Sequence, residues 1–387
     1  MTRVPALALA LAVCLASGRA QAEPLRLRGD ALASVESPVG LLVLDGEGGV
    51  KRDVSAEAMV WLGADGDGLD GDALVMAIIA RRHDGRAELR VGRFVTTAGA
   101  LRPVHVDGAS ARVRLPYRLD AEVFSGLSVI PRFNAFRNDW VAGGRVGRRL
   151  GDWGGFGVAF LEERDRGVPS TRELGVDASA ALGRSDLAGR VALDLIDPAL
   201  ADVTLTARRK VGPVRVELSA DHRLASHLIP ATSLFSVLGD VASERVGAAL
   251  RWRAAPRLDL LADGGARRFD GDTAADGLVR ATLRLDDAGK GALSAELRRT
   301  GAVEGGWTGG RLAARIPCGP LTAALEAELV KPDQDRGHGT LWPWAMTSLG
   351  WSRGLWDAAI AGEASSTPTD RYRLDVLAQV GRRWEVP

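Results

Sequence analysis

Apolar and polar residues alternate in short segments along most of the chain, from residue 25 to residue 384. Successive side chains of an extended strand point to opposite faces, so this alternation predicts strands with one apolar and one polar face. Segments of about eight to twelve residues between turns are typical of antiparallel sheets. In the clearest segment, residues 371–384, one face carries Tyr372, Leu374, Val376, Ala378 and Val380. The pattern predicts an all-β protein.

The connections between these segments fall into two sets. One set is short and contains the Gly, Pro and Asp that tight hairpins require: residues 83–86, 150–155, 183–186, 210–213, 254–257, 286–290 and 352–355. The other set is mostly longer and polar: residues 95–108, 128–137, 222–240, 268–276 and 332–340. This arrangement predicts a single transmembrane antiparallel β-barrel with short periplasmic turns and longer outer loops, and an even strand number of about 16–22.

A soluble, secreted all-β protein is the alternative, because alternation does not say whether the apolar face meets lipid or a second sheet. A packed sheet core needs bulky side chains, whereas these apolar faces are rich in Ala, Val and Leu. Several tryptophans lie near predicted strand ends, as interfacial aromatic residues do in membranes: Trp140, Trp252, Trp307, Trp342, Trp351, Trp356 and Trp384. We therefore favour lipid outside and a wide lumen inside.

The first 22 residues predict a secretory signal peptide. Arg3 precedes an apolar run over residues 4–16, and Ala20-Gln21-Ala22 forms a small-residue cleavage site. A lipoprotein signal at Cys14 is the alternative, although Val13 stands where a small residue is expected. We divide the chain into a signal peptide at residues 1–22 and a β-barrel at residues 23–387. The expected location is the bacterial outer membrane, with its lipid and the barrel-assembly machinery as partners.

Composition excludes several other classes of protein. The 50 Lys and Arg residues nearly balance the 49 Asp and Glu residues, so the net charge indicates no nucleic-acid partner. Cys318 is the only cysteine after residue 22, so no disulfide can form within the predicted mature chain. The longest later apolar run, residues 74–80, is too short for a membrane-spanning helix. No linker or low-complexity segment divides the chain further.

The segment from residue 86 to residue 149 is strongly basic. It contains 12 arginines and one histidine, against Glu88, Asp107, Asp120, Glu122 and Asp139. Guanidinium groups fixed around a pore attract anions and bind carboxylate or phosphate. The alternative for each arginine is an ordinary ion pair with an acidic residue of the lumen wall. The candidate lumen or constriction residues are Arg90, Arg93, Arg102, Arg112, Arg114, Arg145 and Arg149.

Two features of this basic segment leave alternatives open. Strict alternation places Arg93 on the lipid face, so we predict a bulge at Gly92 that turns Arg93 inward and Phe94 outward. An Arg93 side chain that reaches the membrane edge is the alternative. The loop at residues 95–108, which carries Arg102 and His105, is long enough to fold inward as a constriction. A surface loop without a special role is the other possibility.

Enzyme chemistry finds little support in the sequence. The five histidines, His83, His105, His222, His227 and His338, lack the spacing of a metal site. No serine nucleophile motif with a histidine partner and no phosphate-binding glycine loop is present, so we expect no enzyme, no metal and no cofactor. The charged run at residues 162–166 predicts a solvated rim, with a contact to a divalent ion or lipopolysaccharide as the alternative.

Three short stretches resemble known outer-membrane barrels. RVGRF at residues 90–94, HVDGASARVRLP at residues 105–116 and GVDASAAL at residues 175–182 resemble porin-like barrels. Among these are the exopolysaccharide-export barrels of deltaproteobacteria and, more distantly, alginate-export porins. The resemblance implies a passive conduit that works, in the polysaccharide case, with periplasmic export components.

The sequence therefore predicts a porin-like conduit with an arginine-rich lumen. It would pass anionic solutes or export a polysaccharide. A structural or assembly barrel that conducts nothing and anchors an envelope complex is the alternative from a different class.

Overall fold

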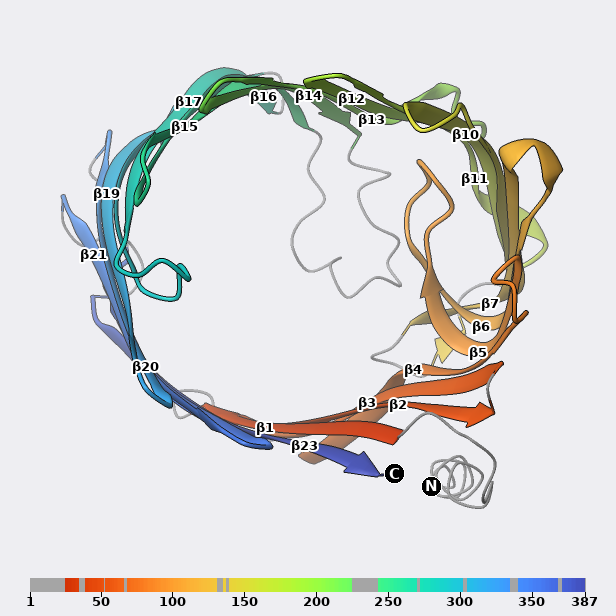
Figure 1. The fold of residues 1–387 in the computed structure, drawn as a ribbon, viewed down its shortest axis with the longest axis horizontal. Helices are drawn as coiled ribbons and strands as arrows, with labels where there is room; N and C mark the ends of the chain where they lie inside the picture. The colour runs from red at the N-terminus through yellow and green to blue at the C-terminus, as the bar shows by residue number, and fades with distance from the viewer. Residues whose placement is uncertain are drawn as a thin grey trace.

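The computed structural model describes residues 25–34, 39–51, 53–65, 68–130, 135–136, 139–224, 243–269, 272–301, 305–334, 340–367 and 371–386. In these residues the chain forms a closed antiparallel β-barrel of 22 wall strands (Figure 1). One further two-residue strand, β8, pairs only with the end of β7. The predicted all-β barrel with an even strand number is confirmed. The predicted signal peptide, residues 1–22, lies outside the described residues.

The strands follow one another around the wall in chain order, with one short 3₁₀ turn, η1 (Pro116–Arg118), between β6 and β7. Their bounds are β1 (Leu25–Ser34), β2 (Val39–Lys51), β3 (Val54–Asp65), β4 (Gly68–Arg81), β5 (Ala87–Thr96), β6 (Val104–Arg114), β7 (Leu119–Ile130), β8 (Ala135–Phe136), β9 (Trp140–Arg149), β10 (Gly154–Asp165), β11 (Val168–Leu182), β12 (Ser185–Asp194), β13 (Ala199–Val211), β14 (Val214–Arg223), β15 (Ser243–Ala255), β16 (Leu258–Phe269), β17 (Asp272–Arg284), β18 (Ala292–Thr300), β19 (Trp307–Cys318), β20 (Leu321–Pro332), β21 (Trp342–Arg353), β22 (Trp356–Ser365) and β23 (Arg373–Val386).

Pairing between the first and last strands closes the barrel. β1 pairs with β23 from Leu25 opposite Val386 to Ser34 opposite Leu377. This pairing satisfies the backbone groups that an open sheet would leave at its two edges. The two ends of the described chain therefore lie at the same end of the barrel.

The turns at the end that carries residues 25 and 386 are tight, and we call this the short-turn end. All seven predicted short turns lie there, between β4 and β5, β9 and β10, β11 and β12, β13 and β14, β15 and β16, β17 and β18, and β21 and β22. In the β17–β18 turn, backbone N–H groups of Gly291 and Lys290 donate to Asp286 and hold the pKa of this carboxyl below its usual value. The opposite end is called the long-loop end.

One predicted long loop is mostly strand. Residues 268–276 were expected to form a loop, but β16 continues to Phe269 and β17 begins at Asp272. The two strands pair as far as Phe269 opposite Asp272. Polar residues at a strand tip resemble a loop in sequence, because both are exposed to solvent.

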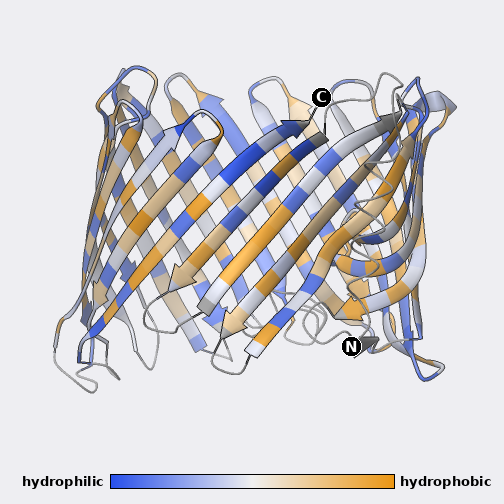
Figure 2. Ribbon diagram, turned by 90° about the horizontal axis from the view of Figure 1, so that it is seen from below, coloured by the Kyte–Doolittle hydropathy of each residue, from blue (hydrophilic) through white to orange (hydrophobic). Residues whose placement is uncertain are grey.

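The outer face of the wall is apolar and the inner face is polar. Exposed leucines and valines mark the outer face of most strands. On β17 these are Val279 and Leu283, and Arg280 and Arg284 occupy the alternate positions. Orange and blue positions alternate along the tilted strands of Figure 2. The predicted alternation is thus the two faces of one curved sheet, with no second sheet packed against the apolar face within the described residues.

Candidate functional site

The hairpin formed by β5 and β6 bends into the lumen at its tip. Pairing of β5 with β4 ends at Arg93 opposite Met76, whereas pairing of β5 with β6 continues to Thr96 opposite Val104. The tip of the hairpin therefore leaves the wall, and Figure 1 shows it inside the ring of strands, beside β7 and β11. We call residues 93–107 the tongue.

A row of three glycines lies where the tongue bends away. Gly92 on β5 is opposite Gly108 on β6, and Gly108 is opposite Gly126 on β7. Added Cβ atoms would come within 2.2 Å of the Met76 carbonyl oxygen at Gly92 and within 2.1 Å of the Ser125 carbonyl oxygen at Gly108. Gly92 also has a φ of 130°, a conformation that side chains rarely allow. The bend is possible because bare backbones can approach closely there.

The tongue packs its apolar side against the lumen face of the neighbouring strands. Phe94, Leu101 and Val106 from the tongue form a buried cluster with Phe124 of β7 and Leu161 of β10. Only 1% of the Phe94 surface is exposed. The predicted outward position of Phe94 is therefore wrong, because its apolar ring has a core to enter inside the barrel. The pairing of β5 with β4 and with β6 shows no register shift at Gly92, so the predicted β-bulge does not form there.

An ion pair fixes the far end of the tongue to β11. Arg102 Nε donates to Glu173 Oε1 at 2.8 Å, and Arg102 Nη2 contacts the same oxygen. The Glu173 side chain is 2% exposed and that of Arg102 is 11% exposed. Thr96 adds a hydrogen bond to Glu122 of β7 at 3.3 Å. The loop at residues 95–108 thus folds inward rather than lying on the outer surface.

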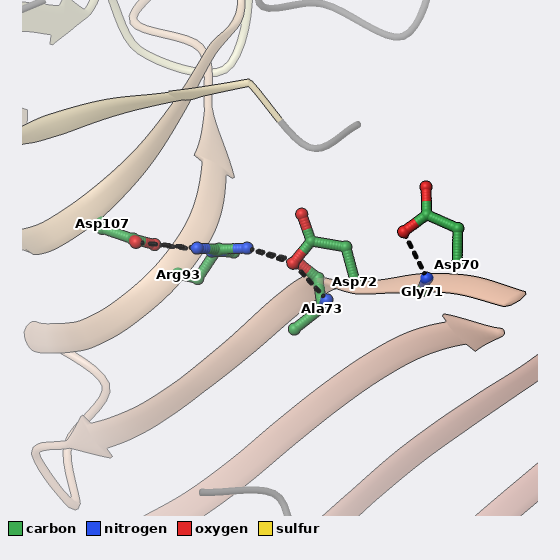
Figure 3. Close-up of polar contacts among 6 residues, drawn as sticks. All are labelled: Asp70, Gly71, Asp72, Ala73, Arg93 and Asp107. Atoms are coloured by element: carbon green, nitrogen blue, oxygen red, sulfur yellow. Dashed lines mark hydrogen bonds and ion pairs between the residues drawn. The ribbon is translucent and has the colours of Figure 1, made fainter. Parts of the chain in front are cut away.

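Arg93 ties the other side of the tongue to β4 (Figure 3). Its Nε and Nη2 donate to the two carboxylate oxygens of Asp107 at 2.7 and 2.9 Å. Its Nη1 donates to Asp72 at 2.8 Å and to the Ala73 carbonyl oxygen at 2.9 Å. The guanidinium therefore replaces the strand pairing that β4 loses where β5 departs. Arg93 neither lines an open lumen nor extends along the membrane edge.

Arg145 lies flat across the lumen face of β9 and β10. Its Nη1 donates to Asp120 at 2.9 Å, and its Nε and Nη2 donate to Asp177 at 3.0 and 2.7 Å. Gly157 makes the space, since an added Cβ would lie 2.3 Å from Arg145 Nη2. The tip of the tongue reaches the same point, where a Cβ at Gly99 would lie 2.8 Å from Arg145 Cδ. Arg145 therefore lies between the wall and the tongue.

The remaining four candidates lie on the inner face and differ in their partners. Arg90 lies 3.7 Å from Glu57 and 5.7 Å from the ring centre of Phe94. Arg112, Arg114 and Arg149 are exposed, and no ion pair of theirs within 4.0 Å is found in the described part of the chain. All three lie on the half of the strand that leads to the short-turn end.

A recess of about 680 Å³ lies in the part of the lumen near the short-turn end. Its polar lining includes Arg145, Arg149, Asp120, Asp177 and Asp186. Arg145 is occupied by two of these carboxylates, and the other two arginines of the lining, Arg148 and Arg149, are exposed.

The local excess of arginine is answered mainly by acids from outside the basic segment. Glu57, Asp72, Glu173 and Asp177 lie before residue 86 or after residue 149, and each approaches one of the candidate arginines. Sequence reasoning missed all four, because strand register alone decides which distant residues become neighbours. Cross-strand pairs elsewhere on the wall follow the same rule, including Arg245 with Asp263 and Asp276.

Trp307 and Trp342, which the sequence predicts at the membrane surface, instead face inward. Trp344, which the sequence analysis did not single out, faces inward as well. Trp307 on β19 and Trp342 and Trp344 on β21 occupy alternate positions to the exposed Leu312 and Leu349. The alternation in residues 342–351 carried this signal, since Trp342 and Trp344 share a face with Met346 and Ser348.

Among the described residues, no group of three or more His, Cys, Asp or Glu side chains could hold a metal ion. No helix in the same residues is long and apolar enough to cross a membrane.

Comparisons with known protein families and with curated proteins gave no match. The P pilus usher PapC translocation pore is similar in structure, with a TM-score of 0.51 at 10% identity over 95% of this chain and all of that one. A chain of the E. coli PapC-PapD-PapK-PapG assembly intermediate gives a TM-score of 0.57 at 9% identity, over 93% of this chain and 61% of that one. Pseudomonas aeruginosa OccK2 in complex with glucuronate gives 0.44 at 11% identity, over 95% and 97%. The usher comparisons show the barrel fold.

Proposed function

We propose that this barrel is an outer-membrane conduit for hydrophilic solutes, with a preference for anions. The observation that supports it most is the closed wall, apolar outside and charged inside. A wall of 22 strands encloses more space than its own side chains fill. The tongue then narrows the conduit on one side. The structural neighbours that are translocation pores are consistent with this proposal.

Aromatic residues of the outer face support a membrane location. Trp252, Trp351, Trp356 and Trp384 all lie on the outer face near the short-turn end. The guanidinium of Arg382 lies 4.6 Å from the ring centre of Trp356 and 5.2 Å from that of Trp384. Such a band of Trp and Arg suits the boundary between lipid and water. In this orientation the short-turn end faces the periplasm.

The preference for anions rests on three arginines. Arg112, Arg114 and Arg149 present guanidinium groups to the lumen, while the other candidates are held by carboxylates. Their electrostatic field would raise the anion concentration in the part of the lumen near the short-turn end. The effect should weaken at high salt, since exposed charges are screened.

Planar-bilayer recordings across a salt gradient test this proposal. We expect an open, anion-selective conductance for the full chain. Replacing Arg112, Arg114 and Arg149 together by Gln should lower the anion-to-cation permeability ratio by a factor of about two to ten. Arg209→Gln is the matched control, because Arg209 shares the outer face of β13 with the exposed Leu205. A folded sample that conducts nothing would favour the structural-barrel alternative.

Polysaccharide export is the narrower form of the same proposal. Periplasmic export components would then deliver the polymer to the short-turn end. Deletion of the gene should reduce surface polysaccharide, and an unchanged amount would remove this version while leaving the solute conduit in place. We propose no catalytic activity for the barrel, since its lumen residues are explained as ion pairs and as conduit wall.

A further inference from the structure

The lumen wall near the long-loop end carries a set of three tryptophan rings. Trp307 begins β19, and Trp342 begins β21 with Trp344 two residues later, so all three lie at the long-loop end. Across the sheet, Trp307 is opposite Pro332, Trp342 is opposite Val330 and Trp344 is opposite Glu328. β20 therefore separates two aromatic positions on the same inner face. Each ring is partly exposed.

Neighbouring groups fix the orientation of two of these rings. Trp344 Nε1 donates to Glu363 Oε1 at 2.8 Å. The Trp307 ring lies over Gly309, where an added Cβ would come within 3.0 Å of it. Arg298 lies 4.9 Å from the centre of the same ring. Rings held in this way lose little side-chain entropy when a ligand binds to them.

Hydrogen-bonding groups surround the rings at the same height. Arg298, on the inner face of β18, pairs with Glu328 of β20. Glu363 completes the polar set beside Trp344. A guanidinium has five N–H donors and a carboxylate can accept several hydrogen bonds, which is more than these contacts use.

A packing role does not account for this arrangement. The buried apolar cluster of the barrel lies under the tongue, on β7, β9 and β10, and contains no tryptophan. An interfacial role needs the outer face, which Trp307, Trp342 and Trp344 do not occupy. Partly exposed rings on a wet wall leave apolar surface in contact with water, which a ligand with an apolar face would cover.

We propose that Trp307, Trp342 and Trp344 form a saccharide-binding site at the long-loop mouth of the conduit. A sugar ring has a C–H face that stacks on indole and an edge of hydroxyl groups that bond to carboxylates and guanidinium groups. The inference deepens the proposed function, on which it rests for a route to the lumen, by giving the class of solute. Neutral and uronic-acid saccharides share the C–H face and the hydroxyl edge.

Equilibrium binding to the folded full chain in detergent micelles tests the site without any conductance. Maltohexaose serves as the neutral probe and hexagalacturonate as the acidic probe, with titration calorimetry as the readout. We expect at least one probe to bind, and Trp344→Ala to weaken it by a factor of about three to ten. Trp344→Phe, which keeps a ring, should retain most of the affinity.

Trp351→Ala is the matched control, because Trp351 lies on the outer face of the same strand. Its affinity for the probe should equal that of the wild type. The site is disproved if neither saccharide binds to the folded barrel, or if Trp351→Ala weakens binding as much as Trp344→Ala. Bilayer recordings on the same sample separate the two proposals: saccharide binding by a barrel that conducts nothing would overturn the conduit and keep the site.

Discussion

At the scale of single residues, a charged side chain is explained by partners that may lie far away in the sequence. Arg102 contacts Glu173 across 71 positions, and Arg93 bonds Asp72 across 21. A count of charges within one segment could not include these acids. The count predicted an excess of positive charge. Among the candidate arginines, the structure pairs Arg90, Arg93, Arg102 and Arg145 with acids and leaves Arg112, Arg114 and Arg149 exposed.

Glu173→Gln should destabilise the barrel and loosen the tongue. Removing one partner of a buried ion pair costs about 3–5 kcal/mol, because the other charge stays buried without compensation. The expected result is a lower unfolding temperature of the detergent-solubilised barrel, measured by the gel shift between folded and heated samples. Single-channel recordings should also show more current noise.

Glu162→Gln is the control for this change. Glu162 pairs with Arg164 and Arg172 on the outer side of β10 and β11, and those arginines are more than a third exposed. Exposed pairs contribute little to stability, so the unfolding temperature should barely change. Equal losses in the two variants would contradict the anchoring role of Glu173.

At the scale of elements, the alternation correctly predicted the strands but not where one of them leaves the wall. β5 and β6 keep regular pairing through the bend, so their sequence resembles an ordinary hairpin. The interpretation of Phe94 failed for this reason: alternation gives the face of a strand, while the bend decides what that face meets. Gly92, Gly108 and Gly126 allow the bend only because they are in register.

Gly108→Ala should disturb this bend. The added methyl would meet the Ser125 carbonyl oxygen and the backbone of Gly126, which cannot move as a flexible side chain can. We expect a loss of about 1–3 kcal/mol in the free energy of unfolding, typical of overpacking. Denaturant titration monitored by tryptophan fluorescence measures it. Gly362→Ala is the control, since nothing lies within 4 Å of its added Cβ, and a similar loss there would contradict the role of Gly108 in the bend.

At the scale of the whole molecule, barrel closure depends on residues at opposite ends of the chain. The sequence predicted a range of strand numbers because short segments near the N-terminus could have merged or lain outside the wall. β1 pairs with both β2 and β23, so the short segments near the N-terminus belong to the wall, which has 22 strands. Closure also places successive connections between wall strands at alternate ends of the barrel.

The orientation proposed for the barrel can be tested with its exposed thiol. Cys318 lies at the end of β19, at the short-turn end, and is exposed. In intact cells a large maleimide reagent should leave Cys318 unlabelled, whereas permeabilised cells should show full labelling. The control places a cysteine at the opposite end, Asp197→Cys in a Cys318→Ser background, and should be labelled in intact cells. Labelling of Cys318 in intact cells would reverse the orientation.

The sequence by itself determined the fold class, the two faces of the wall and the positions of the tight turns. These are local properties: side-chain alternation follows from strand geometry, and turns follow from Gly, Pro and Asp. Only the tertiary structure decided which arginines are neutralised, where the tongue goes and which tryptophans face inward together. Such properties depend on strand register and on a bend inside a closed wall, which bring distant residues into contact.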